Sequence, residues 1–160
     1  MTMKNFEHAL RVYWEDTDAG GIVFYANYLK FFERARTEWL RAAGFEQQRL
    51  RDEAGLIFVV AATSVRYLSP AKLDDFLHIT VEPREIGRAS MTIFQTARRM
   101  NEPPRVAPCA TLPPEGARVA LGRPGADSTL LAEGEIRIGC VAAATLKTAR
   151  IPVPILEALS

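Results

Sequence analysis

The sequence predicts an α+β fold in which one long helix packs against a five-stranded antiparallel sheet. Residues 22–43 repeat apolar side chains at three- and four-residue steps, which is the period of a helix with one buried face. Five other segments carry apolar runs or alternate apolar and polar residues, as strands do. These segments are residues 6–14, 56–67, 76–84, 88–100 and 130–142.

The chain has the size and composition of one soluble globular domain, which we expect to span residues 1–160. Of its 160 residues, 48% are apolar and 24% are charged, and the formal net charge is +1. Binding to nucleic acid needs a concentrated basic face, and this charge balance does not suggest one. No nucleic-acid partner is therefore expected.

The first strand and the long helix are separated by a turn. Residues 15–21 combine acidic residues, a threonine and two glycines, a composition that breaks a strand. Gly44 follows the last helical turn and is a natural stop. Residues 45–53 are expected to form a short second helix.

The later strands carry their own signals. Gly87 marks a tight turn between the third and fourth strands, so we expect these two to pair antiparallel. Cys140 lies in an alternating apolar run and is expected to be a buried small hydrophobic residue. Residues 151–159 are expected to form a short apolar cap or helix.

Residues 101–128 differ from the rest of the chain because they hold six prolines and three glycines. We expect this Pro/Gly-rich insert to be a mobile hairpin extension between two strands. The sequence leaves open whether it is a tolerant loop tip or a functional segment.

No metal, no cofactor and no membrane segment are expected. The two cysteines, Cys109 and Cys140, form no C-x-x-C pair, although one disulfide is arithmetically possible, and His8 and His78 lie far apart. The N-terminus lacks the long apolar stretch of a signal peptide. The longest apolar run, residues 56–62, is too short to span a membrane. We therefore expect a cytoplasmic protein.

A single helix covers only part of a five-stranded sheet. The exposed edge or face of the sheet is expected to associate with a second copy of the chain, most often about a two-fold axis.

The run most informative about chemistry is residues 16–28, Asp-Thr-Asp-Ala-Gly-Gly-Ile-Val-Phe-Tyr-Ala-Asn-Tyr. A carboxylate, Asp18, stands before a glycine turn that leads into a helix N-terminus. The first helical amides lack intrahelical acceptors and lie at the positive end of the helix dipole. Such an amide can stabilise an oxyanion by about 3–4 kcal/mol. The carboxylate can attack the same carbonyl or take a proton from water, so the run holds the two parts that acyl transfer needs.

Asp18 also has a structural interpretation, because an aspartate ahead of a helix is commonly an N-cap. The spacing by itself leaves both interpretations open. Asp16 is expected to be a loop or cap residue.

The run from Tyr13 to Tyr28 closely resembles the 4-hydroxybenzoyl-CoA thioesterase family. Residues 31–38, Phe-Phe-Glu-Arg-Ala-Arg-Thr-Glu, resemble the branch of that family associated with the Tol-Pal envelope system. The resemblance covers most of the chain apart from the insert, and it continues through residues 58–60, Tyr67 and residues 69–75.

This resemblance implies a hotdog fold, in which the antiparallel sheet wraps around the long central helix of a homodimer or homotetramer. It implies hydrolysis of an acyl-CoA thioester, without cofactor or metal, at a site on the dimer interface. The family's catalytic aspartate corresponds to Asp18. Its oxyanion donor, a backbone amide at the helix start, corresponds to Tyr25.

One position departs from the Tol-Pal branch, in which a histidine often occupies the place of Tyr25. An amide donor tolerates this change because the backbone N–H is the same, whereas a mechanism that needs an imidazole does not. Aromatic acyl groups therefore stay candidates beside aliphatic ones.

Four further residues are candidates for substrate binding. Asn27 either orients water or substrate or is a polar residue of the first helical turn. Glu33 is either a second carboxylate near the site or a solvated or ion-paired side chain. Arg88, with Ser90 beside it, stands where the family often places basic residues against CoA phosphates, which arginine binds with bidentate geometry. Its alternative is an ordinary surface arginine.

Three other arginines lie on the long helix. Arg34, Arg36 and Arg41 are expected to face solvent or to form ion pairs.

Other functions stay open. An acyl-ACP thioesterase would recognise the same phosphopantetheine arm as an acyl-CoA thioesterase. A dehydratase needs a positioned acid/base pair, and both histidines fall in predicted strands away from the acidic run. A non-enzymatic acyl-binding or scaffold protein of the envelope machinery is the third alternative, against which the intact Asp18 argues. The sequence does not separate a nucleophilic Asp18 from a general base.

Overall fold

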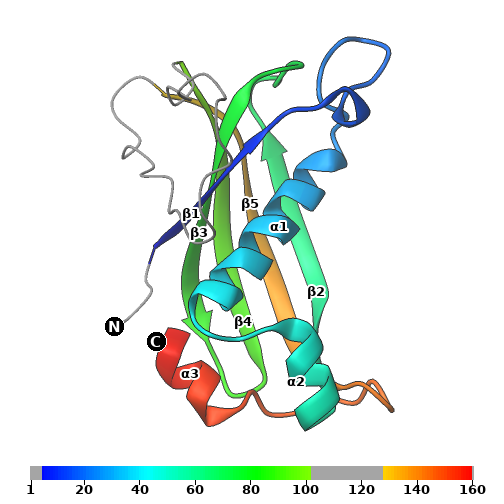
Figure 1. Cartoon of the computed structure of the whole chain (residues 1–160), viewed down its shortest axis with the longest axis vertical. Coiled ribbons are helices and arrows are strands. Elements are labelled where there is room, and N and C mark those ends of the chain that lie inside the picture. Colours follow the sequence, from blue (N-terminus) through cyan, green and yellow to red (C-terminus); the bar gives the residue numbers. More distant parts are fainter. Residues whose placement is uncertain (1–4, 102–127, 160) are drawn as a thin grey trace, which may run out of the picture.

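The computed structural model describes residues 5–101 and 128–159, and it confirms the predicted α+β arrangement of a long helix against a curved sheet (Figure 1). No helix among these residues is long and apolar enough to cross a membrane. The elements are β1 (Phe6–Arg11), the 3-10 turn η1 (Trp14–Asp16), α1 (Asn27–Ala42), α2 (Gln47–Ala54), β2 (Leu56–Tyr67), β3 (Phe76–Ile86), β4 (Ser90–Met100), β5 (Ser128–Ala142) and α3 (Val153–Leu159).

The five strands form one antiparallel sheet in the order β1-β3-β4-β5-β2, so β1 and β2 are its edges. β3 and β4 pair across the turn at Gly87, as predicted, and the Gly87 N–H donates to the Ser90 carbonyl at 2.8 Å. β2 pairs antiparallel with β5, with a register shift between Val60 and Ala62.

The apolar stripe of α1 is its core-facing surface. Phe31, Phe32 and Trp39 are at most 1% exposed, and full burial of such side chains contributes about 1.5–3 kcal/mol each. In Figure 1, α1 runs diagonally across the concave face of the sheet. The sheet side of the core includes Leu77, Ile79, Val81, Ile93, Leu131 and Ile136.

The long helix begins at Asn27, and the prediction that it begins at residue 22 is wrong. Ile22 forms an isolated β-bridge with Lys72, and Val23 forms one with Thr17. These apolar residues continue the helical spacing in the sequence, but β-type hydrogen bonds hold them outside the helix.

The first strand is shorter than predicted, because it ends at Arg11 and the chain turns into η1 at Trp14. Trp14 is 80% exposed, so it does not share the inner face with Phe6. The other strands agree closely with their predicted ranges, and β2 has the predicted bounds, 56–67. The short second helix and the C-terminal helix are also present.

Cys140 is fully buried and free, as its apolar surroundings predict. Burial raises the pKa of its thiol. The predicted hairpin extension at residues 101–128 falls almost wholly outside the described residues, as does Cys109.

β2 is the edge strand that α1 leaves open. Among the described residues it pairs with β5 alone, so its outer row of backbone groups faces away from the sheet. Val60 and Tyr67 of this strand are 52% and 44% exposed. An open edge with exposed apolar side chains is a surface suited to association.

Gly134 sets how closely α1 approaches the sheet. A Cβ at this position of β5 would lie 3.1 Å from the Ser64 carbonyl oxygen and 3.2 Å from the Phe32 ring. Both neighbours are fixed, because one is strand backbone and the other is a buried core side chain. The glycine therefore allows α1 to lie close to the sheet.

We expect Gly134→Ala to lower the free energy of unfolding by about 1–3 kcal/mol, because the added methyl overpacks this contact. Gly139→Ala is the matched control on the same strand, since its Cβ would meet nothing closer than a Val59 methyl at 3.9 Å. Urea unfolding of both variants measures the difference. Equal stabilities would show that the sheet and α1 yield easily at Gly134.

Candidate active site

A short hairpin carries Asp18 at its tip. Thr17 and Val23 form an antiparallel bridge, and the Asp18 N–H donates to the Ile22 carbonyl at 2.9 Å. Gly21 closes the turn with a φ of +75°, which glycine adopts without strain. The side chain of Asp18 is exposed at the end of this turn.

The Asp18 carboxylate is held by its own turn. Its Oδ1 accepts a hydrogen bond from the Gly20 N–H at 2.8 Å, the local bond typical of an Asx-turn. Among the described residues Oδ2 has no hydrogen-bond partner, so one carboxylate oxygen is available. The N-cap of α1 is Ala26, which excludes the N-cap interpretation of Asp18.

Asp16 and Asn27 fasten this hairpin to α1. The Asp16 carbonyl accepts hydrogen bonds from the Phe24 N–H and from Asn27 Nδ2, both at 2.9 Å. The Asp16 carboxylate accepts a bond from the Tyr13 N–H at 2.9 Å, so Asp16 is a cap residue, as predicted. Asn27 is 6% exposed, and its side-chain amide serves this anchor.

Tyr25 lies between the hairpin and the first residue of α1. Its carbonyl accepts a hydrogen bond from the Tyr67 hydroxyl at 3.0 Å. Its N–H donates to no acceptor within the described residues. An unused amide at the positive end of a helix dipole can donate to a carbonyl oxygen. The same loop therefore presents a carboxylate and an amide donor.

A hollow of about 260 Å³ opens beside Tyr25. Tyr28 and Tyr67 form part of its wall, and their ring centroids are 5.5 Å apart in an edge-to-face arrangement. Burial is the main cause that raises the pKa of both phenols above the usual value for tyrosine. Both therefore stay protonated at neutral pH, and the hollow offers aromatic walls with few polar groups, as ligand sites commonly do.

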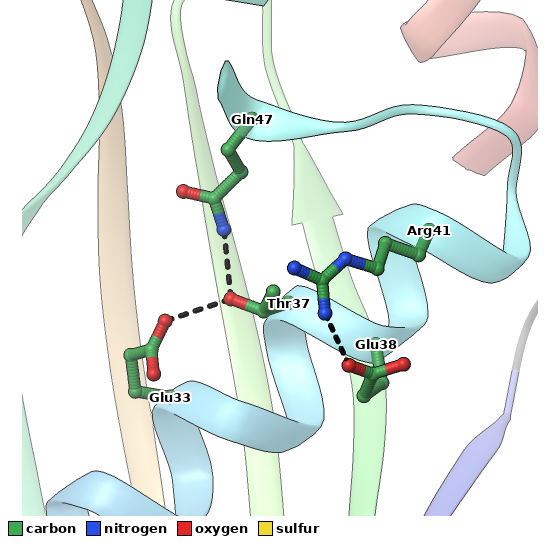
Figure 2. A network of polar contacts seen from close by, with 5 residues as sticks. All are labelled: Glu33, Thr37, Glu38, Arg41 and Gln47. Atoms are coloured by element: carbon green, nitrogen blue, oxygen red, sulfur yellow. Dashed lines mark hydrogen bonds and ion pairs between the residues drawn. The ribbon is translucent and has the colours of Figure 1, made fainter. Parts of the chain in front are cut away.

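Glu33 is held further along α1. Its carboxylate accepts a hydrogen bond from the Thr37 hydroxyl at 2.7 Å, and this hydroxyl accepts one from Gln47 Nε2 at 2.8 Å. Figure 2 shows this chain joining α1 to the start of α2, beside the ion pair of Arg41 with Glu38. Glu33 is exposed but hydrogen-bonded, and Arg41 is ion-paired, as predicted.

Arg36 is buried, which corrects the prediction that it faces solvent or pairs with a carboxylate. It is 9% exposed, and its Nη1 donates to Gln95 Oε1 at 2.9 Å. The sequence held a signal for this burial, since Arg36 follows the core residue Phe32 by one helical turn. Gln95 likewise falls in the inward-facing register of β4.

Arg88 and Ser90 lie at the other end of the sheet from Asp18. Arg88 lies in the turn between β3 and β4, and Ser90 is the first residue of β4, an 11-residue strand whose last residue, Met100, is roughly 30 Å away. The hairpin with Asp18 lies near that far end (Figure 1). The structure of one chain therefore does not bring Arg88 and Ser90 together with Asp18.

The sheet register fixes this separation. Val12, which precedes the hairpin, donates its N–H to the Asp75 carbonyl at 2.9 Å, and Leu77 pairs with Arg99 near the end of β4. Ser90 instead lines a second hollow of about 580 Å³, whose wall also carries Arg137 and Glu135. This hollow has both polar and apolar lining residues, and it extends from β2 across β5 and β4 to the turn at Gly87.

The described residues hold no group of three or more His, Cys, Asp or Glu side chains placed to bind a metal ion. His8 lies in β1 and His78 in β3, both outside the hairpin.

The family of the chain follows from comparison with known proteins. The model of the thioesterase-like superfamily matches residues 12–159. The chain belongs to the thioesterase-like superfamily.

Two thioesterase relatives are similar in sequence. The acyl-CoA thioesterase YbgC of Haemophilus influenzae is 48% identical over 99 residues, which are 62% of this chain and 73% of the relative. The acyl-CoA thioester hydrolase YbgC of Escherichia coli O6:H1 is 38% identical over 147 residues, 92% of this chain and 90% of the relative.

Solved structures share the fold of this thioesterase-like chain. A mutant 4-hydroxybenzoyl-CoA thioesterase in complex with 4-hydroxybenzoyl-CoA superposes with a TM-score of 0.77 at 18% identity, covering 98% of this chain and 99% of that one. A hypothetical protein of Aquifex aeolicus superposes with a TM-score of 0.73 at 26% identity, covering 97% of this chain and 99% of that one. The fold is therefore the hotdog fold.

We expect Asn27→Ala to loosen the hairpin. The change removes the buried bond to the Asp16 carbonyl, so it should lower the free energy of unfolding by about 1–2 kcal/mol. It should also speed amide hydrogen exchange in residues 16–24. Exchange monitored by mass spectrometry checks this, with Lys30→Ala, an exposed change in the same helical turn, as the control. Unchanged exchange in residues 16–24 would show that other bonds hold the hairpin.

Proposed function

We propose that this protein hydrolyses acyl-CoA thioesters to a free acid and CoA. The observation that carries the proposal is the loop on which the exposed Asp18 carboxylate and the unused Tyr25 amide occur together. Membership of the thioesterase-like superfamily and the two acyl-CoA thioesterase relatives support it.

In this proposal the Tyr25 N–H holds the thioester carbonyl oxygen and stabilises the negative charge that develops there. As a general base, Asp18 takes a proton from a water whose oxygen forms the new C–O bond. The C–S bond then breaks, and the CoA thiolate takes up the proton. As a nucleophile, Asp18 forms an anhydride while CoA leaves, and water then hydrolyses the anhydride. Both routes need the same carboxylate and amide, and neither needs a cofactor.

The site is proposed to be completed by a second subunit. When two copies pair antiparallel through the open edge of β2, each end of one sheet lies beside the opposite end of the partner's sheet. The turn that carries Arg88 and Ser90 in the partner subunit then approaches the hairpin that carries Asp18. This arrangement supplies CoA phosphates with an arginine that one chain alone places roughly 30 Å away. The minimum assembly is a homodimer, and a homotetramer is a pair of such dimers.

Asn27 and Glu33 take supporting places in this proposal. Asn27 fixes the loop through the Asp16 carbonyl, and Glu33 lines the path of the acyl group along α1. The proposed location is the cytoplasm, where a free thiol such as Cys140 persists. Acyl carrier protein is a second proposed donor of acyl groups, and the resemblance to the Tol-Pal branch suggests work beside the envelope machinery.

We expect Asp18→Asn to reduce hydrolysis of acyl-CoA by about 10²–10⁴-fold. The amide oxygen of asparagine can still accept the hydrogen bond from the Gly20 N–H, so the turn keeps its shape while the carboxylate is lost. The measurement is thiol release from a panel of short, long-chain and hydroxybenzoyl CoA thioesters.

The control for this prediction is Asp52→Asn, which changes another exposed aspartate that accepts one hydrogen bond. No turnover by the wild type with any thioester would favour a non-enzymatic acyl-binding protein. Equal rates for wild type and Asp18→Asn would remove Asp18 from the mechanism and make Glu33 the next carboxylate to test.

Co-expressed Asp18→Asn and Arg88→Ala subunits test the shared site. Arg88→Ala should raise KM about tenfold or more by removing a charged donor to CoA. If each site takes Asp18 from one subunit and Arg88 from the other, a mixed dimer holds one intact site. We expect the mixture to hydrolyse substrate at low concentration, which neither parent does. No recovery in proven mixed dimers would show that each subunit supplies its own site.

A further inference from the structure

Arg36 carries a buried charge, and the proposed hydrolysis does not use this charge. A guanidinium has five N–H donors, and within the described residues the bond to Gln95 Oε1 is the one side-chain hydrogen bond that Arg36 makes. Gln95 is itself fixed, because its Nε2 donates to the Phe32 carbonyl at 3.1 Å. Arg36 is therefore held in place from one side while its other donors remain available.

A cavity of about 110 Å³ has Arg36 in its wall. Glu33, Arg36 and Thr37 of α1 supply polar groups to its wall, and Gln47 of α2 supplies another. The side chains in Figure 2 show three of these residues on one side of α1, linked through the Thr37 hydroxyl. Most of the remaining wall is apolar and comes from α1, β2, β4 and β5. The cavity thus combines an apolar shell with a small polar cluster.

The cavity and the hollow beside Tyr25 both lie between α1 and β2, in a region that we call the seam. Both are lined by α1 on one side and by β2 on the other. Arg36 follows Asn27 by nine residues, which at about 1.5 Å per residue is roughly 13 Å along the helix. An acyl group that starts at the Tyr25 amide and follows the seam must therefore be a chain of medium length to reach Arg36.

The polar cluster fits a hydroxyl group better than a carboxylate. Burial lowers the pKa of Arg36 and the charge of Glu33 opposes that shift, so the two charges act on each other. A ligand hydroxyl can accept from the Arg36 guanidinium and donate to the Glu33 carboxylate. A ligand carboxylate would be attracted by Arg36 but repelled by the like charge of Glu33, so only the hydroxyl is bound favourably by both groups.

We propose that Arg36 is a specificity-determining residue and that this cavity receives the hydroxylated far end of a medium-length acyl chain. The inference rests on the proposed function, which sets the point along the seam where the acyl group starts. The substrate class that it names is ω-hydroxyacyl thioesters. A plain hydrocarbon end gives the remaining Arg36 donors no acceptor, and a site built to hydrogen-bond a hydroxyl rejects ligands that lack one.

The wild-type protein tests this without any variant. The probes are non-hydrolysable CoA thioethers with a decyl arm, an ω-hydroxydecyl arm or an ω-carboxydecyl arm, and calorimetric titration gives the dissociation constant of each. We expect the hydroxylated arm to bind about 10- to 100-fold more tightly than the plain arm. Because no turnover is needed, this result stands even if the protein hydrolyses none of the thioesters, which would overturn the proposed function alone.

Variants separate recognition from a structural role. Arg36→Met should abolish the preference for the hydroxylated arm, and the plain arm should bind more tightly than to the wild type because no buried donor is left unpaired. Arg34→Met, an exposed arginine of the same helix, is the matched control and should keep the preference. If Arg36→Met does not fold, the double change Arg36→Met with Gln95→Leu replaces the buried polar pair by apolar residues and serves the same purpose.

Three results would overturn the proposal. The first is equal binding of the plain and hydroxylated arms by the wild type. The second is tighter binding of the carboxylated arm. The third is a hydroxyl preference that survives Arg36→Met.

Discussion

The close contact of α1 with β5 at Gly134 is the constraint on which the rest of the molecule depends. With no side chain at that point, the Phe32 ring lies directly on the sheet backbone, and the stripe of α1 that includes Phe31 and Trp39 is buried with it. The helix packs mainly against β1, β3 and β4, and no residue of β2 at the other edge is buried. The hollow beside Tyr25 and the cavity beside Arg36 both lie in the seam that results.

The sequence predicted the elements in which one interaction dominates over many residues. Strand β2 and the body of α1 follow from apolar periodicity, because burial of one face decides both. The start of α1 did not follow, since Ile22 and Val23 keep the helical spacing while pairing with Lys72 and Thr17. The β-bridge to residue 72 forms only in the folded chain, so the local spacing of apolar residues cannot predict it.

The same distinction explains what was foreseen of the candidate site. Asp18 and Tyr25 lie in one short run, so a local motif was enough to place a carboxylate and an amide on one loop. Arg36 was expected to face solvent or to form an ion pair because charge usually indicates exposure, although one helical turn from Phe32 is an inward position. Its burial depends on Gln95, a partner 59 residues away. Arg88 and Ser90 were grouped with the site by resemblance alone, and the sheet register places them at its far end.

The separation of Arg88 from Asp18 in one chain connects two features of the molecule, its exposed apolar side chains and its open site. Trp14, Tyr25 and Val60 are 80%, 63% and 52% exposed, and a folded chain gains free energy when apolar surface of this kind is covered. The chemistry proposed for Asp18 needs a site from which bulk water is kept away, and the loop that carries it is open. A second subunit at the β2 edge would meet both needs, because it would cover exposed apolar side chains and restrict the access of water to the loop that carries Asp18. In such an assembly, the stability of the dimer and the reactivity of the site would depend on the same contacts.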